Sequence, residues 1–174
     1  MILASVSLFD FMDSFERYRP NVAVLLTDGH GRVLLCERIE ERYSGIFQTV
    51  QGGIDEGESV VDAALRETSE ELGIDPSVIT ILGVMEKKFR YRWTEEYLAS
   101  IAYRSSPFIG QEHHFVFAQI EPGTPMVLDA HQREFRRVLW GTPQELIEKS
   151  WEGKRPGFIA ALEYFGLLNV KFLA

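Results

Sequence analysis

Short apolar runs separated by turn residues dominate the first third of the chain. Residues 22–27 are a continuous apolar run rich in β-branched side chains, and the turn-forming sequence at 28–31 separates them from a second segment at 32–37, which is apolar between Arg32 and Glu37. Runs of this length and composition are typical of buried strands, and glycine beside aspartate favours a tight turn. The pattern therefore predicts a β-hairpin, followed by a third short extended segment at 46–51.

Three later segments show the composition and end signals of helices. Residues 60–72 contain good helix formers, follow a capping Ser59 and precede Gly73, a residue type favoured just past a helix end. Residues 142–149 repeat the capping pattern with a proline in the first turn. Residues 156–167 place apolar side chains on one face, which is typical of a helix packed on a core.

Residues between the first and second predicted helices show further strand patterns. A bend at Gly83 makes the first of these segments either one bent strand or two, and the stretch 121–133, which contains proline and glycine, predicts a long loop. The predicted strands are 78–93, 97–103, 113–120 and 135–140. Strands with helices interspersed in the middle and at the end of the chain predict the α/β class, with a mixed sheet between helical layers in an α/β/α sandwich.

The composition is that of a globular enzyme domain. The chain has 174 residues, of which 45% are hydrophobic and 25% charged, and this length lies within the range of one domain with a full core. We therefore expect a single domain over residues 1–174, with residues 1–17 as an N-terminal extension. The apolar part of that extension is too short to span a bilayer and has no basic leader, so we expect no membrane association.

Cysteine content and net charge indicate the cellular compartment and limit the possible binding partners. The only cysteine, Cys36, excludes an internal disulfide and fits a reducing compartment, so we expect a cytoplasmic protein. Its position in an apolar run favours a core thiol over a nucleophile. The net charge of −8 argues against a stable complex with nucleic acid. A polyanionic substrate would therefore have to be met by local cations.

The candidate chemistry is concentrated between Gly52 and Ile74. Glu67, Glu70 and Glu71 are spaced i, i+3 and i+4 on the predicted helix, so they share one face with Cβ atoms roughly 5–6 Å apart. Carboxylates this close repel each other, and a hard divalent ion such as Mg²⁺ binds carboxylates together with substrate phosphates. The alternative is a solvated acidic face of the helix.

Seven residues in a fixed register favour the metal site over that alternative. At ordinary amino-acid frequencies the register arises by chance at one start position on the order of 10⁻⁸ of the time. The seven are Gly52, Glu58, Arg66, Glu67, Glu70, Glu71 and Gly73. The segment resembles the signature box of the Nudix hydrolases, a family that cleaves a nucleoside diphosphate linked to another moiety. One box position departs from the family pattern, because Thr68 stands where Ile, Leu or Val is usual.

The resemblance implies a Nudix fold and roles for the residues of the box. The bound ion would be Mg²⁺, or Mn²⁺ in its place. The metal ligands that the resemblance implies are Glu67, Glu70, Glu71 and the carbonyl of Gly52. Glu58 and Arg66 would form a salt bridge that ties the loop to the helix, and the alternative for them is an ordinary surface ion pair worth about 0–1 kcal/mol.

Residues on both sides of the box resemble one branch of the family. These flanks are Tyr18-Arg19-Pro20-Asn21-Val22, Gln48, Gln51-Gly52-Gly53-Ile54 and Ile109-Gly110-Gln111. They are similar to the bacterial RNA pyrophosphohydrolases and the plant-type diadenosine polyphosphate hydrolases. Two features differ from that branch. Val50 replaces a common proline, and Glu112-His113-His114 replaces a lysine-rich stretch, which removes cationic contacts expected for RNA.

The same resemblance nominates residues for the substrate and for water. Arg19 and Arg38 match phosphate-binding positions, for which a guanidinium is well suited. Tyr91 matches an aromatic residue that could stack on a base, with core packing as its alternative. Lys154 belongs to a basic pair near the substrate mouth, and Glu134 matches a loop carboxylate that can bind another metal or activate water. Each of the four charged residues has a solvated surface position as its alternative.

Together these residues predict metal-assisted hydrolysis of a pyrophosphate linkage. A box glutamate such as Glu70, or Glu134, would take the proton of the attacking water. The expected substrates are 5′-triphosphate RNA ends or dinucleoside polyphosphates of the diadenosine tetraphosphate type. Three alternatives remain open: a hydrolase of ADP-ribose or another nucleotide sugar, an isomerase of an allylic diphosphate that would need a catalytic cysteine, and a non-catalytic nucleotide- or RNA-sensing module that would usually lack box glutamates.

Overall fold

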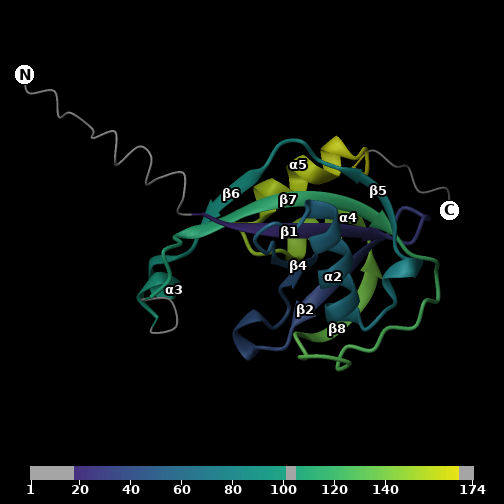
Figure 1. Ribbon diagram of the computed structural model, residues 1–174, viewed down its shortest axis with the longest axis horizontal. Helices are drawn as coiled ribbons and strands as arrows, with labels where there is room; N and C mark the ends of the chain where they lie inside the picture. The colour runs from purple at the N-terminus through teal and green to yellow at the C-terminus, as the bar shows by residue number, and fades with distance from the viewer. Residues whose placement is uncertain (1–17, 101–104, 169–174) are drawn as a thin grey trace, which may run out of the picture.

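The computed structural model of the protein describes residues 18–100 and 105–168 (Figure 1). The predicted extension at 1–17 lies outside these residues, as do positions 101–103 of the predicted strand 97–103. The described strands join into one eight-stranded sheet that contains both parallel and antiparallel pairs. The mixed sheet therefore agrees with the class predicted from the sequence.

The central strand of the sheet is β1 (Tyr18–Thr27). Its residues 21–27 are buried, because side chains on both faces of this strand are covered by other elements. β1 pairs in parallel along its whole length with β7 (Gly110–Gln119). It pairs antiparallel with β4 (Val50–Gly53) through residues 21–24. β1 thereby fixes the position of the two glycines that begin the acidic box.

The remaining strands extend the sheet on both sides of β1. β2 pairs with β3 and β8, whereas β5 and β6 pair with β7. Their bounds are β2 Val33–Arg38, β3 Phe47–Gln48, β5 Thr80–Val84, β6 Phe89–Arg92 and β8 Phe135–Gly141. β5 and β6 are separate strands, and the pairing of β5 with β7 is irregular between Ile81 and Gly83, where the sequence predicted a bend.

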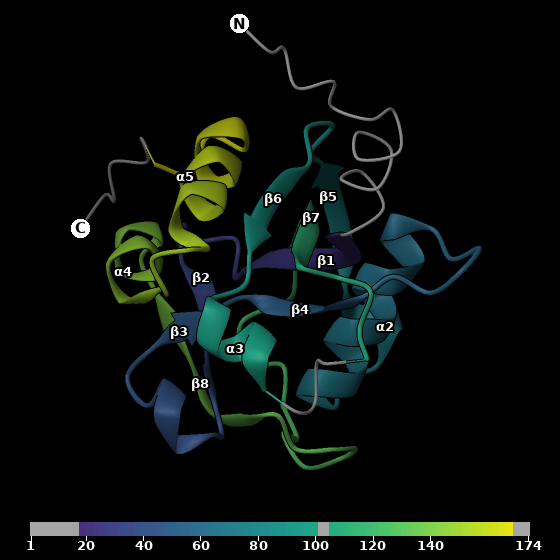
Figure 2. The ribbon, with the colours of Figure 1, turned by 90° about the vertical axis from the view of Figure 1, so that its left-hand side faces the viewer.

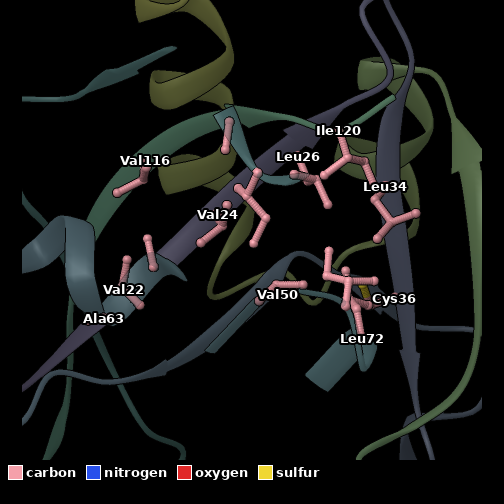
Figure 3. Packing of buried hydrophobic residues seen from close by; sticks show 14 of the residues in the cluster. Val22, Val24, Leu26, Leu34, Cys36, Val50, Ala63, Leu72, Val116 and Ile120 are labelled. Atoms are coloured by element: carbon pink, nitrogen blue, oxygen red, sulfur yellow. The ribbon is translucent and has the colours of Figure 1, made fainter. Parts of the chain in front are cut away.

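Helices cover both faces of the sheet, with α2 on one face and α4 and α5 on the other (Figure 2). On the α2 face, Val22 packs with Ala63 and Leu72 (Figure 3), and on the opposite face Leu25 packs with Phe158. The helices are α2 Val60–Leu72, α3 Glu95–Ala99, α4 Pro143–Lys149 and α5 Arg155–Tyr164, with the 3-10 turns η1 Glu41–Tyr43 and η2 Pro76–Val78. None of the helices in the described ranges has the length and hydrophobicity that crossing a bilayer requires.

Both ends of α2 carry the signals that predicted it. The Ser59 hydroxyl accepts a hydrogen bond from the backbone N–H of Asp62 at 3.0 Å and caps the first turn. Gly73 ends the helix with φ of 60°, in the left-handed region that favours glycine. A Cβ at this position would also lie 2.3 Å from the carbonyl oxygen of Val127. These two caps fix the start and end of the helix that carries the three glutamates.

One expectation from the sequence is confirmed in a shorter form and another is corrected by the structure. β1 and β2 pair antiparallel across the predicted turn, but the hairpin is short: the pairing is at Thr27 and Val33, and further from the turn β1 pairs with β4 and β2 with β8. Residues 97–99 belong to α3 and not to a strand. The Thr94 hydroxyl accepts a hydrogen bond from the Tyr97 N–H at 3.2 Å, and this cap favours a helix despite the aromatic residues nearby.

Candidate active site

A cavity of about 800 Å³ lies beside β4 and is lined by residues from many parts of the chain. Its lining includes two groups that we name here. The carboxylate wall consists of Gly52, Glu67 and Glu134, which line the cavity, together with Glu70 and Glu71, which neighbour Glu67 on α2 but are not among the lining residues. The aromatic wall consists of Tyr43, Phe47, Tyr91, Trp93, Tyr97 and Trp151. The cations that line the cavity are Arg19, Arg38, Arg42 and Lys154.

β4 presents its two glycines to opposite sides, because successive residues of a strand face opposite ways. A Cβ built on Gly52 would lie 1.9 Å from the carboxyl carbon of Glu67. A Cβ built on Gly53 would lie 2.3 Å from Nη2 of Arg19. Any side chain at either position would displace a charged group of the cavity, so both close approaches require glycine.

Arg66 joins the loop, the strand and the helix of the acidic box. Its guanidinium donates to both carboxylate oxygens of Glu58 at 2.8 Å, to the carbonyl of Gly53 at 2.9 Å and to Glu67 at 2.8 Å. Glu70 lies 3.6 Å from the same guanidinium. The ion pair predicted between Glu58 and Arg66 is therefore present. It holds the pKa of Glu58 down at about 2, mainly through the hydrogen bonds from Arg66.

Buried carboxylates of the wall have the opposite shift. Glu71 is 5% exposed and accepts a hydrogen bond from the Gln51 N–H at 3.3 Å. Burial raises its pKa well above the ordinary value, and the charges of Glu134 and Glu67 raise it further. Burial also raises the pKa of Glu67, against the opposing effect of Arg66. The carboxylates thus lie close enough to repel each other in a poorly hydrated place.

The arrangement suits a divalent ion, although no three His, Cys, Asp or Glu side chains of the described residues are gathered tightly enough to bind one as they stand. Carboxylates and a main-chain carbonyl are the donors that hard divalent ions prefer. The close approach of Glu67 to Gly52 brings one carboxylate against the backbone of β4. The residues that could hold such an ion are Glu67, Glu70, Glu71 and the carbonyl of Gly52.

Two arginines and Glu134 complete this part of the cavity. Arg38 forms a two-pronged pair with Glu40, with distances of 3.0 and 2.8 Å, and its guanidinium lies 3.7 Å from Glu134. Arg19 lies against Gly53, as described above. The structure thus places both predicted phosphate-binding arginines and the predicted loop carboxylate in one cavity with Glu67.

Tyr91 and Lys154, the two other predicted substrate residues, also line the cavity. The Tyr91 hydroxyl donates to Gln111. The Tyr91 ring makes T-shaped contacts with His113 and Trp151, with ring centres 5.1 and 5.6 Å apart. The Lys154 ammonium lies 5.6 Å from the Tyr91 ring centre. Only 8% of Tyr91 is exposed. Most of the Tyr91 surface is therefore packed against other residues, as the alternative of core packing predicted. A small part faces the cavity.

Lys154 is held by two glutamines. Its ammonium donates to the side-chain oxygens of Gln48 at 3.1 Å and Gln51 at 2.5 Å. Burial lowers the pKa of Lys154 to about 7, with a further contribution from the positive charge of Arg38. This lysine therefore changes charge near neutral pH, unlike the arginines of the same cavity.

Several lining residues carried no signal in the sequence. They are Tyr43, Phe47, Trp93, Tyr97, Trp151 and Arg42. These residues come from η1, β3, the position just after β6, α3 and the segment before α5, and no local spacing relates them. Thr68, the box position that departs from the family pattern, is fully buried and its hydroxyl has no hydrogen-bond partner among the described residues.

Comparison with known proteins gives matches over most of the chain. The NUDIX domain matches residues 17–162. An RNA pyrophosphohydrolase of Novosphingobium aromaticivorans is 34% identical over 131 residues, which cover 74% of this chain and 80% of the relative. An RNA pyrophosphohydrolase of Erythrobacter litoralis is 33% identical over 152 residues, which cover 86% of this chain and 91% of the relative.

Solved structures with the same fold have much lower identity. The E. coli dihydroneopterin triphosphate pyrophosphohydrolase aligns with a TM-score of 0.66 at 17% identity, covering 89% of this chain and all of that one. A C. elegans Ap4A hydrolase binary complex aligns with a TM-score of 0.58 at 16% identity, covering 83% and 96% of the two chains. At this identity the likeness concerns the fold.

Proposed function

This chain belongs to the NUDIX family of hydrolases, and from that premise we propose that it cleaves a phosphoanhydride bond in a nucleoside polyphosphate. The proposed substrates are 5′-triphosphate RNA ends and dinucleoside polyphosphates of the diadenosine tetraphosphate type. The names of the relatives, RNA pyrophosphohydrolase and Ap4A hydrolase, support this choice. So does the extent of the similarity, which runs from strand β1 into helix α5.

The observation that carries the proposal is that one cavity holds all three kinds of group that such a substrate needs. Glu67 and Glu134 both line the cavity, Glu134 lies 3.7 Å from the guanidinium of Arg38, and aromatic rings form another part of the lining. A nucleoside polyphosphate combines a phosphate chain, which binds arginine and metal ions, with a flat apolar base. A site for a small neutral substrate would not need four cations.

NUDIX hydrolases generally need a divalent ion, and we assign Mg²⁺ to this chain, with Mn²⁺ as a substitute. Glu67, Glu70, Glu71 and the Gly52 carbonyl are its proposed ligands. When bound, the ion neutralises charge on the phosphates and lowers the pKa of water. Burial and mutual repulsion raise the pKa values of Glu67 and Glu71, and a bound cation would lower them again because it attracts the deprotonated carboxylates.

The remaining steps belong to side chains of the protein. Arg66 and Glu58 hold the loop against α2 and so fix the position of Glu67. Glu70 or Glu134 takes the proton from the attacking water. Arg19, Arg38 and Lys154 bind the phosphates, and Tyr91 bounds the base. Each of these roles is a proposal that rests on the position of the residue in the cavity.

Three broader expectations go with this function. We propose that residues 1–174 act as one hydrolase domain, with 1–17 as an extension. We propose a cytoplasmic setting, which the single cysteine supports. The substrate is either a small nucleotide or the 5′ end of an RNA, and the net charge of −8 argues against a stable complex with nucleic acid beyond that end.

The test is a product analysis with and without Mg²⁺ on three substrates: 5′-triphosphate RNA, diadenosine tetraphosphate and ADP-ribose. Mg²⁺-dependent release of phosphate-bearing fragments from either of the first two supports the proposal. Cleavage of ADP-ribose alone would assign the chain to nucleotide sugars. If no substrate is cleaved while Glu70→Gln and the unchanged protein bind nucleotide equally well, the chain is a sensing module.

A further inference from the structure

Two tyrosines at the edge of the cavity are bridged by one arginine. Tyr43 belongs to η1 and Tyr97 to α3, both line the cavity, and both are partly exposed. The guanidinium carbon of Arg42 lies 4.8 Å from the centre of the Tyr43 ring and 5.9 Å from the centre of the Tyr97 ring. We call Tyr43 and Tyr97 the rim pair. A planar cation thus contacts two aromatic rings that come from distant parts of the chain.

The rim pair differs from Tyr91, the aromatic residue that the sequence nominated. Tyr91 is 8% exposed and packs against His113 and Trp151, so little of its face is left for stacking. Both rings of the rim pair are more exposed, and the group that bridges them is the flexible side chain of an exposed arginine. Arg42 forms no salt bridge within the described residues. It can therefore leave the rings without breaking an ion pair.

Charges of both signs surround the rim pair. Glu40 and Glu96 line the cavity nearby, but Glu40 is paired with Arg38. The Arg38 guanidinium carbon lies 5.8 Å from the centre of the Tyr43 ring. The shape of the group that contacts both rings, rather than the local charge, therefore indicates what they bind. A guanidinium is flat and stacks on aromatic rings much as a base does, so the position of Arg42 shows that the rim pair accepts a flat group.

We propose that the rim pair is a stacking platform for a second nucleobase of the substrate, and that the Arg42 guanidinium holds this position until the base enters. The inference rests on the proposed function, which supplies the polyphosphate. It adds which residues bind the second nucleoside that both proposed substrate classes carry. The second base is either that of the second nucleotide of an RNA or that of the far nucleoside of a dinucleoside polyphosphate.

Steady-state kinetics on three substrates test the platform: ATP with one nucleoside, diadenosine tetraphosphate with two, and the triphosphorylated dinucleotide pppApG. Tyr97→Leu and Tyr43→Leu should each raise KM about tenfold for at least one substrate with two nucleosides, the loss expected for one stacked base. KM for ATP and all kcat values should change less than twofold. Tyr97→Phe should behave like the unchanged protein, because it keeps the ring.

Tyr164→Leu is the matched control, since Tyr164 is 53% exposed on α5 and does not line the cavity. It should change none of the three KM values. A loss confined to diadenosine tetraphosphate supports the platform and assigns it to a far nucleoside, whereas a loss confined to pppApG supports it and assigns it to the second nucleotide of RNA. The platform is overturned if both leucine variants leave all KM values unchanged or raise that of ATP equally.

Arg42→Gln tests the placeholder role. It should lower KM for the affected substrate about twofold, because the guanidinium no longer competes with the base. A rise in KM would overturn that role.

Binding in EDTA separates this proposal from the proposed function. Tryptophan fluorescence, to which Trp93 contributes with its ring 5.4 Å from that of Tyr97 and Trp151 from elsewhere in the lining, reports binding of the dinucleotide ApG and of AMP without turnover. Tyr97→Leu should weaken ApG about tenfold and leave AMP unchanged. If the protein cleaves no polyphosphate but shows this difference, the platform stands and the hydrolase function fails. If it cleaves polyphosphates and ApG binding is unaffected, the platform fails alone.

Discussion

The carboxylate wall and the aromatic wall line the same cavity, but the chain builds them in different ways. Apart from Glu134, the carboxylate wall comes from one stretch, residues 52–71, in which a loop runs directly into α2. The aromatic wall is assembled from η1, β3, β6, α3 and the segment before α5. One wall therefore depends on spacing along a helix, and the other depends on the whole fold.

Substitutions in the two walls should therefore have different kinetic effects. A substitution in the carboxylate wall acts on groups proposed to bind the divalent ion or to take the proton from water, so it should change kcat. A substitution in the aromatic wall removes contact area far from the reacting bond, so it should change KM and the choice of substrate.

Glu70→Gln should lower kcat by about 10²–10⁴-fold, because it removes a proposed metal ligand and candidate base while keeping the size of the side chain. The side chain of Glu70 is 49% exposed, so the melting temperature should stay within a few degrees. Mg²⁺-dependent release of products measures the rate. Glu163→Gln, an exposed glutamate of α5 outside the cavity, is the matched control. A loss below tenfold would mean that the reaction does not occur at this wall.

Gly52→Ala should lower kcat by about 10²-fold, the cost of moving a reacting group by an ångström. The added Cβ would lie 1.9 Å from the Glu67 carboxyl carbon, so either that carboxylate or the β4 backbone must move. Gly123→Ala is the control. It has φ of 87° and open space around its Cα, so it should cost about 1–2 kcal/mol of stability without changing the rate. If Gly52→Ala and the unchanged protein have equal rates, the position of Glu67 does not matter for the reaction.

The sequence predicted features whose cause is local. Ser59 and Gly73 bound α2 because capping is decided within one turn, and the glutamates of one helix face follow from the helical period. The bend near Gly83 and the long loop at 121–133 have equally local signals. This is why the residues of the carboxylate wall could be predicted one by one. The sequence contains no measure of how close Glu134, which is far along the chain, lies to the others.

Features with a tertiary cause were missed or mistaken. Residues 97–99 were expected in a strand, since Tyr97 and Leu98 suit one, but the Thr94 cap and the packing of Tyr97 near Trp93 place them in a helix. No spacing in the sequence relates Tyr43 to Tyr97. Both tyrosines contact Arg42 because the fold brings η1 and α3 close together, and only the folded structure shows this.

Glu58→Gln tests how firmly the carboxylate wall is held. The Glu58 pKa of about 2 lies below its ordinary value of 4.5, so the ion pair with Arg66 stabilises the fold at pH above about 4.5 and loses this effect as the pH falls towards 2. The side chains are 15% and 30% exposed, so the substitution should cost about 1–2 kcal/mol at pH 7 after allowance for screening. Urea unfolding at pH 7, 4 and 3 should show the difference shrinking. Glu95→Gln, in an exposed pair with Arg92, should show none.

The smallest effect should come from Lys154, where the two walls meet through Gln51, the residue that binds both Lys154 and Glu71. With a pKa of about 7, Lys154 is cationic below neutral pH and neutral above it, so KM for a polyphosphate should rise as the pH passes through 7. We expect about a fivefold rise, the effect of one partly exposed charge contact.

Diadenosine tetraphosphate is the right substrate for this measurement, because it lacks the terminal phosphate group that titrates near pH 6 in ATP. Lys154→Met should give a flat profile of KM against pH. Lys149→Met, which removes a lysine of α4 paired with Glu145, should keep the slope. Arg38 and Glu71 act on Lys154 with opposite signs, and His113 is kept neutral by burial. If KM still changes with pH in Lys154→Met, the titrating group belongs to the carboxylate wall. Charge in that wall would then affect KM, and the assignment of kcat effects to one wall and KM effects to the other would fail.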